Sequence, residues 1–224
     1  MEKTSVAIDG PSGAGKSTLA RMLAKKFCLI YVDTGALYRS IGLYVCRKGV
    51  ASKDAEQVEK MLPEISVELK YNEKGEQRVV LNGEDVSEDI RLPEISIYAS
   101  DVSAMPPVRK FLLEMQRDMA RKYNVIMDGR DIGTVVLPGA GLKIFLTASA
   151  EERAMRRYHE LQGKGIETNY EDVLKDMIYR DKNDSSRAMA PLKAADDAVL
   201  VDTTGNTLER SFEILSAIVK EHLD

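Results

Sequence analysis

The chain has 224 residues, of which 44% are hydrophobic and 30% are charged, so it can bury one sizeable core with small appended subdomains. Its formal net charge of -4 argues against a protein that binds duplex nucleic acid, because such proteins need cationic surface to displace phosphate counterions. The longest apolar runs, such as residues 125–127 and 144–146, fall far below the ~20 residues of a membrane helix, so we expect no membrane partner.

Five short apolar runs bounded by turn residues predict buried strands. They are residues 6–8, 29–32, 125–127, 142–146 and 198–201. Each run is continuous and rich in branched residues, as expected for a parallel strand that is buried on both faces. Between the runs, apolar residues at helical spacing predict helices over residues 19–27, 37–45, 108–119 and 208–219. The alternation predicts an α/β fold, a five-stranded parallel sheet flanked by helices.

Residues 65–86 depart from this alternation. Hydrophobic and polar residues alternate with period two, first before a turn at residues 72–75 and again before the pair Asn82-Gly83. This pattern predicts a small antiparallel β insertion in the α/β core.

Residues 149–187 also depart from the alternation. They predict two short, charged helices separated by Gly163 and Gly165. Ser149-x-x-Glu152 and Thr168-x-x-Glu171 resemble capping boxes and would begin the two helices. The composition predicts a mobile surface element.

The two cysteines, Cys28 and Cys46, fit no metal-ligand spacing and no disulfide framework. We expect both to be buried, reduced thiols. The N-terminus begins with a predicted strand rather than a basic, apolar export signal. Together these features predict a cytoplasmic protein.

The motif GPSGAGKS at residues 10–17 joins the first predicted strand to the helix that follows. Its glycines let successive backbone N–H groups point inward, and the helix adds its positive end, so the loop can cradle a triphosphate. Lys16 would reach the β- and γ-phosphates, and Ser17 would place its hydroxyl on Mg²⁺. A chance glycine-rich turn is improbable, because the motif has the correct flanks on both sides. The predicted nucleotide-binding residues are Gly10, Pro11, Ser12, Gly13, Ala14, Gly15, Lys16, Ser17 and Thr18.

Asp128 and Arg130 follow a central predicted strand at its carboxyl end, where open α/β sheets bind ligands. Asp128 taken alone would be an N-cap for the next segment. Because a phosphate loop lies in the same chain, we favour the interpretation that the Asp128 carboxylate holds Mg²⁺ through water.

Arginine is abundant in the polar loops. The candidates are Arg39, Arg109, Arg130, Arg153, Arg156, Arg157, Arg180 and Arg187. Bidentate guanidinium groups suit a second phosphate and a charged transition state, although solvated helix surface is the ordinary explanation for such residues.

Two other classes of phosphate-loop protein remain as alternatives. A GTP-binding switch should carry an Asn-Lys-x-Asp guanine reader, whereas residues 181–184 read Asp-Lys-Asn-Asp in a helical stretch. A kinase of a different nucleotide or of a small metabolite such as shikimate or gluconate is the nearer rival, although the small-metabolite kinases generally lack a β insertion like residues 65–86.

Four further motifs, taken with the phosphate loop, resemble those of bacterial cytidylate kinases. They are residues 33–39 (DTGALYR), 82–87 (NGEDVS), 128–136 (DGRDIGTVV) and 187–192 (RAMAPL). The resemblance covers nearly the whole chain. It implies transfer of the γ-phosphate of ATP to CMP or dCMP with Mg²⁺ as cofactor, and we expect a monomer whose only partners are these nucleotides. It also implies one kinase domain, with a core at 1–50, 100–148 and 188–224, a nucleoside-monophosphate-binding insertion at about 51–99, and a helical lid at about 149–187.

The resemblance also implies roles for individual residues. The implied substrate-binding residues are Thr34, Arg39, Ser100, Arg109, Arg130, Asp131, Arg180, Asp184 and Arg187. Of these, Arg39, Arg130 and Arg187 would grip the monophosphate, Ser100, Arg109 and Asp131 would read cytosine, and Asp184 would face the ribose. The family often has serine where Thr34 stands, which bears only on sugar preference.

The implied catalytic residues are Lys16, Arg130, Arg157 and Arg187. Arg157 would be the lid arginine that closes over the transferring phosphoryl group. Arg153 and Arg156 remain alternatives for that role.

Overall fold

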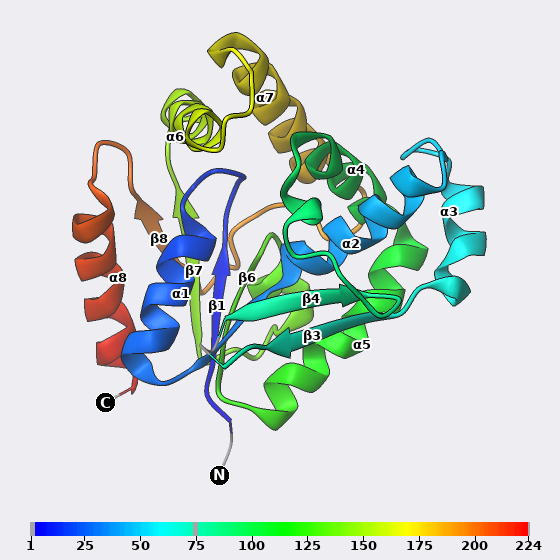
Figure 1. Cartoon of the computed structure of the whole chain (residues 1–224). Helices are drawn as coiled ribbons and strands as arrows, with labels where there is room; N and C mark the ends of the chain where they lie inside the picture. The colour runs from blue at the N-terminus through cyan, green and yellow to red at the C-terminus, as the bar shows by residue number, and fades with distance from the viewer. Residues whose placement is uncertain (1–2, 74–75, 224) are drawn as a thin grey trace.

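The computed structural model describes residues 3–73 and 76–223, and a five-stranded parallel sheet lies at its centre (Figure 1). The strands are β1 (Ser5–Asp9), β2 (Ile30–Asp33), β6 (Val125–Gly129), β7 (Leu142–Thr147) and β8 (Val199–Asp202). Their order is β2-β6-β1-β7-β8, and all neighbours are parallel. The predicted strands and fold class are confirmed. Strands β2 and β6 lie on one side of β1, and the later strands β7 and β8 lie on its other side. The strand order therefore reverses at β1, and open α/β sheets bind ligands at such a point.

Helices cover both faces of the sheet. They include α1 (Lys16–Phe27), α2 (Thr34–Arg47), α5 (Pro106–Lys122) and α8 (Leu208–Leu223). Val6 and Ile8 of β1 pack in one cluster with apolar residues of α1 and α8, whereas Ala7 packs in another cluster on the opposite face. This alternation buries β1 on both sides. No helix in the described part of the chain is long and apolar enough to cross a membrane.

The predicted β insertion is a three-stranded antiparallel sheet. It contains β3 (Val67–Tyr71), β4 (Gln77–Leu81) and β5 (Glu84–Asp85), and α3 (Ala55–Met61) with the short turn η1 (Leu62–Glu64) precedes it. Asn82 and Gly83 have φ values of 49° and 88°, the left-handed pair that closes a tight hairpin. Residues 74 and 75 of the predicted first turn lie outside the described residues.

A helix that the sequence pattern did not predict, α4 (Pro93–Ser103), follows the insertion after the short turn η2 (Asp89–Arg91). Ile95, Ala99 and Val102 of α4 are buried in one cluster with α2 and the insertion. Helix α4 therefore joins the insertion to the core.

Helices α6 (Ala150–Gly163) and α7 (Tyr170–Ser186) stand above the carboxyl ends of the strands (Figure 1). Ser149 caps α6 by accepting from Glu152 N at 3.3 Å, but the Glu152 carboxylate accepts from Gly205 N rather than from Ser149, so only half of the predicted box forms. The predicted cap at Thr168 is wrong. Asn169, one residue later, accepts from Asp172 N at 2.8 Å, because it is the extended residue directly before the helix.

The expectation that both cysteines are buried is wrong, although both are free thiols. Cys28 is exposed because it ends α1 in a left-handed turn with φ 54°. Cys46 is half-buried on α2, with its Sγ 3.2 Å from Glu94 Oε1 of α4.

Candidate active site

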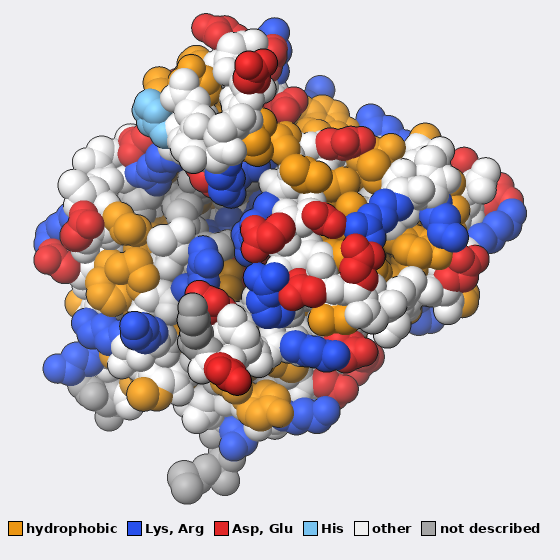
Figure 2. Space-filling model, in the orientation of Figure 1, with side chains coloured by type: hydrophobic (Ala, Val, Ile, Leu, Met, Phe, Trp, Pro, Cys, Tyr) orange, Lys and Arg blue, Asp and Glu red, His pale blue; other side chains and the backbone are white. Residues whose placement is uncertain are grey.

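A cleft of about 630 Å³ opens between the carboxyl ends of the strands and helices α4, α6 and α7. Figure 2 shows Lys and Arg side chains gathered in this hollow beneath the two upper helices. The predicted site residues that line it are Ser12, Gly13, Ala14, Gly15, Lys16, Ser17, Thr18, Thr34, Arg39, Ser100, Arg109, Asp128, Arg130, Asp131, Arg157, Arg180, Asp184 and Arg187. The fold thus brings together residues that are far apart in the sequence.

Gly10 and Pro11 shape the phosphate loop rather than line the cleft. Gly10 has φ 148°, and a Cβ there would lie 1.9 Å from the carbonyl oxygen of Leu146 on β7. Only glycine lets the loop pass this close to the neighbouring strand. The Pro11 carbonyl accepts from Lys16 Nζ at 2.7 Å.

Lys16 is the buried cation of the phosphate loop. It is the first residue of α1, directly after Gly15, whose φ of 87° sets the turn into the helix. Burial and the neighbouring Arg130 lower the pKa of Lys16, an effect that Asp128 and Asp9 oppose. A phosphate placed here would supply a counter-charge and raise the pKa of Lys16 toward its ordinary value.

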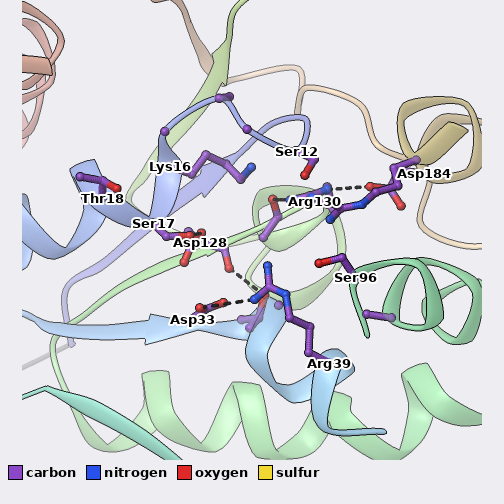
Figure 3. Close-up of a pocket in the computed structure, with 18 of the residues that line it drawn as sticks. Ser12, Lys16, Ser17, Thr18, Asp33, Arg39, Ser96, Asp128, Arg130 and Asp184 are labelled. Atoms are coloured by element: carbon purple, nitrogen blue, oxygen red, sulfur yellow. Dashed lines mark hydrogen bonds and ion pairs between the residues drawn. The ribbon is translucent and has the colours of Figure 1, made fainter. Parts of the chain in front are cut away.

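Asp128 lies beside Ser17 at the floor of the cleft (Figure 3). Its Oδ2 accepts from Ser17 Oγ at 2.8 Å and its Oδ1 accepts from Tyr31 OH at 2.9 Å, so its side chain is directed to hydroxyls rather than to the N-cap that was the alternative. Burial, and then Asp33 beside it, raises the pKa of Asp128 to about 6. A cation near this carboxylate would offset both effects.

The next segment is capped instead by Asp9, at the end of β1. Its two carboxylate oxygens accept from Ile132 N at 2.8 Å and Gly133 N at 2.7 Å, at the start of the π-helical turn Ile132–Val136. This contact ties the strand that precedes the phosphate loop to the loop that carries Arg130 and Asp131.

Four guanidinium groups converge on the part of the cleft that faces the phosphate loop. Arg130 Nε donates to Asp184 Oδ2 at 2.7 Å, and Arg39 Nη1 lies 3.7 Å from Asp33 Oδ2 (Figure 3). Arg180 Nε is buried and has no hydrogen-bond partner among the described residues. Burial and Arg130, with smaller contributions from Arg39 and Arg157, lower the pKa of Arg180 to about 9. The guanidinium groups in this part of the cleft therefore carry more positive charge than the nearby carboxylates neutralise, which suits the binding of a multiply charged anion.

A buried ion pair closes the inner end of the cleft. The Arg109 guanidinium donates to Asp131 Oδ2, and Arg187 Nη2 lies 3.6 Å from Asp131 Oδ1. The Arg109 guanidinium also lies 5.6 Å from the ring centroid of Tyr38. Burial raises the pKa of Asp131, and Arg109 and Arg187 oppose that shift. A buried carboxylate that accepts hydrogen bonds and two buried guanidiniums that donate them can distinguish hydrogen-bond donors from acceptors on a planar ring.

Ser100 lies between Asp184 and Asn183 of α7. Its Oγ donates to Asp184 Oδ1 at 3.3 Å and accepts from Asn183 Nδ2 at 2.8 Å. Both Ser100 and Asp184 are buried and line the cleft. The residues expected to read the base and to face the ribose are thus hydrogen-bonded neighbours.

The three lid arginines differ in how they are bonded. Arg153 is buried and committed to the protein, since it donates to the Ser12 and Ala148 carbonyls at 2.8 and 2.9 Å and pairs with Asp181 at 2.6 Å. Arg156 donates to the Thr203 carbonyl at 3.0 Å. Among the residues that the structure describes, Arg157 pairs only with the half-exposed Glu160, at 2.8 Å, and makes one long contact of 3.4 Å with the Arg91 carbonyl.

Several cleft residues received no role from the sequence. They include Asp33, Tyr38, Arg91, Ser96, Ser103 and Thr203. Asp33 and Tyr38 lie inside the motif at 33–39, which was the available signal. Ser96 and Ser103 lie on α4, and Thr203 follows β8, so only the tertiary fold places them here.

A parallel sheet whose order reverses at β1, with a phosphate loop at that point and a cationic cleft opposite, defines a kinase of the phosphate-loop class. The sequence model of the cytidylate kinase family matches residues 6–221, and the chain belongs to this family. The earlier resemblance is thereby confirmed, and the switch protein and the small-metabolite kinase are set aside.

Curated relatives match over nearly their whole length. A cytidylate kinase of Caldicellulosiruptor saccharolyticus is 50% identical over 220 residues, 98% of this chain and 96% of the relative. Another, from Carboxydothermus hydrogenoformans, is 48% identical and covers 96% of both chains. A solved structure of an uncharacterized protein from Eubacterium ventriosum has a TM-score of 0.51 at 12% identity, over 97% of this chain and 99% of that one, and shows the fold alone.

Proposed function

We propose that the chain transfers the γ-phosphoryl group of ATP to CMP or dCMP, giving ADP and the nucleoside diphosphate. The observation that supports this best is the face-to-face placement of the phosphate loop and the guanidinium cluster across one cleft. One side suits the phosphates of a donor and the other suits the phosphate of an acceptor. The relatives named as cytidylate kinases support cytosine as the acceptor base.

Phosphoryl transfer through a loose transition state needs in-line positioning and neutralised oxygens more than it needs a strong base. Lys16 would leave the Pro11 carbonyl and follow the γ-phosphate. Arg39, Arg130 and Arg187 would hold the acceptor phosphate. Among the lid arginines, Arg157 is the one that its bonding leaves most available to reach the transferring group.

The residues at the floor of the cleft fit Mg²⁺. Ser17 and Asp128 present oxygen atoms side by side, and Asp128 is a buried carboxylate with a raised pKa. Within residues 3–73 and 76–223, no group of three or more His, Cys, Asp and Glu side chains could hold a metal alone. That fits Mg²⁺, which uses one or two carboxylates together with waters and substrate phosphates. When bound, Mg²⁺ would neutralise phosphate charge.

We further propose the division into a core at 1–50, 100–148 and 188–224, a monophosphate-binding insertion at about 51–99 and a lid at about 149–187. The small sheet within 51–99 and the separate apolar cluster formed by Ala154, Leu161 and Val173 support the division. Closure of the lid would exclude water that otherwise hydrolyses ATP.

The test is a product assay with purified protein, Mg²⁺ and ATP. With CMP or dCMP present, we expect CDP or dCDP and ADP in equal amounts, and without an acceptor we expect little ADP. Release of ADP at the same rate with and without CMP would contradict the proposal and indicate an NTP hydrolase.

A further inference from the structure

One buried carboxylate outside the cleft joins three segments of the chain. Asp101, on α4, is 6% exposed. Its Oδ1 accepts from Tyr179 OH of α7 and its Oδ2 accepts from Ser52 Oγ, between α2 and α3, both at 2.6 Å. Hydrogen bonds from hydroxyls to an ionised carboxylate are short and strong. None of Asp101, Tyr179 and Ser52 lines the cleft, so their roles are not direct substrate contacts.

The same two helices present site residues directly beside this contact. Ser100 precedes Asp101 on α4, and Arg180 follows Tyr179 on α7; both line the cleft. Asp184, one turn further along α7, accepts from Ser100 Oγ at 3.3 Å. The placement of Arg180 and Asp184 in the cleft therefore depends on how the carboxyl-terminal half of α7 is held on α4.

The amino-terminal half of α7 packs elsewhere. Val173 is buried with Ala154 and Leu161 of α6 in a small cluster of its own. Helix α7 therefore packs on α6 at its start and on α4 at its end (Figure 1), and Arg153 of α6 also pairs with Asp181 near the end of α7 at 2.6 Å. If the contact with Asp101 persists, a movement of α6 with the start of α7 must bend or pivot the chain before Tyr179 and open the pair between Arg153 and Asp181.

The Tyr179 hydroxyl is well suited to a lasting contact. Burial and the hydrogen bond to Asp101 raise the pKa of Tyr179, so the phenol remains a proton donor at neutral pH. Lys53 Nζ lies 5.4 Å from the centroid of the Tyr179 ring and adds a contact from the same connection that carries Ser52.

We propose that Asp101 and Tyr179 are positioning residues for the acceptor nucleotide. They fix the carboxyl-terminal half of α7 on α4, so that Arg180 and Asp184 keep their places while the rest of 149–187 closes. This inference rests on the proposed function. It also places one hinge of the lid within α7, before Tyr179, rather than at the end of the lid near residue 187.

The kinetic test uses Tyr179→Phe, which removes only the donated hydrogen bond. We expect KM for CMP to rise about five- to tenfold, with KM for ATP changed by less than about twofold, because the effect is confined to the acceptor side. Tyr158→Phe is the matched control. It makes the same change on α6, where the hydroxyl accepts from the exposed Gln162 at 2.8 Å, and should alter neither KM.

Asp101→Ala should raise KM for CMP by at least a similar factor, because it also loses the hydrogen bond from Ser52. The double variant should be no worse than Asp101→Ala, since that change alone already removes the contact with Tyr179. Equal increases in both KM values, or a lower Tm with both KM values unchanged, would show that the contact is only structural. A wild-type enzyme that does not phosphorylate CMP would instead refute the proposed function.

Hydrogen exchange tests the hinge independently. A bisubstrate analogue that joins adenosine and cytidine through phosphates should slow exchange in residues 150–176, whereas residues 179–186 should be protected before it is added. In Tyr179→Phe the free protein should lose that protection. Exchange at 179–186 as fast as at 165–176 in the free wild-type protein would overturn the proposal.

Discussion

Replacing Arg180 with Met should stabilise the ligand-free protein while it damages acceptor binding. Burial and Arg130 lower the pKa of Arg180 from its ordinary value to about 9, which at face value is ~5 kcal/mol against the charged form. Solvent reaches this partly exposed side chain through the cleft, so we expect only ~1–2 kcal/mol to be regained in the free energy of unfolding. The pKa of Arg180 lies above 7 in both the folded and the unfolded protein, so the destabilisation is fully present at neutral pH. It is relieved only as pH rises through about 9, the pKa in the folded protein.

The assay is thermal unfolding of both proteins at pH 7 with and without CMP, together with steady-state kinetics. A gain of ~1–2 kcal/mol corresponds to a rise in Tm of ~2–8 °C for a chain of this size. KM for CMP should rise by ~10–100-fold, because charge-assisted hydrogen bonds to the phosphate are lost. The stabilisation of the wild-type protein by CMP should be reduced in the variant.

Arg153→Met is the matched control, a second lid arginine with the opposite environment. Its guanidinium satisfies the Ser12 and Ala148 carbonyls and Asp181, so its loss should lower the free energy of unfolding by ~3–5 kcal/mol. If Arg180→Met lowered Tm as Arg153→Met does and left KM for CMP unchanged, Arg180 would be a structural residue and the reasoning would be wrong.

Three further predictions concern the donor site, the base and the metal. Lys16→Met should lower kcat by ~10²–10³-fold or more without loss of the circular dichroism of the folded protein, and near-normal turnover by a folded variant would exclude the assigned role. Arg109→Met should lower kcat/KM for CMP and reduce the ratio of kcat/KM for CMP to that for UMP, while KM for ATP stays nearly constant. An equal loss of kcat/KM for CMP and UMP would show that Arg109 does not recognise the base. Since burial raises the pKa of Asp128 to about 6, Mg²⁺ must displace a proton below that pH. Activity at limiting Mg²⁺ should therefore fall as pH drops through about 6, and excess Mg²⁺ should move the midpoint lower; a midpoint that Mg²⁺ does not move would contradict this assignment.

The strands and the phosphate loop were predictable because their signals are local. Strands buried on both faces must be apolar throughout, and residues 10–17 combine glycines with a lysine and a serine in one continuous stretch. The hairpin at Asn82-Gly83 is equally local, because both positions need positive φ.

Helix α4 and the turn at 132–136 escaped prediction for different reasons. Pro93 at the first position of α4 was a usable signal, but the helix buries its apolar face mainly against α2, which local periodicity does not show. The π-helical turn is held by Asp9, more than a hundred residues earlier in the chain. No local pattern encodes that contact.

For the site, the sequence and the family resemblance predicted most of the residues that line the cleft named above, but not how they pair. The Arg109–Asp131 ion pair and the partners of Asp128 depend on which strand ends and helices meet. The difference between Arg153 and Arg157 is likewise tertiary, because both lie on the same helix one turn apart and only the first reaches the Ser12 carbonyl.

The acceptor specificity of the wild-type enzyme tests the central claim most directly. We would measure kcat/KM for CMP, dCMP, UMP and AMP with ATP and Mg²⁺. Cytosine offers an N4 amino donor with N3 and O2 acceptors, whereas uracil presents an O4 acceptor and an N3–H donor. Two mispaired buried contacts at ~1–3 kcal/mol each predict that CMP exceeds UMP by ~10²–10⁴-fold, with dCMP also accepted. Equal kcat/KM values for CMP and either UMP or AMP would contradict the account.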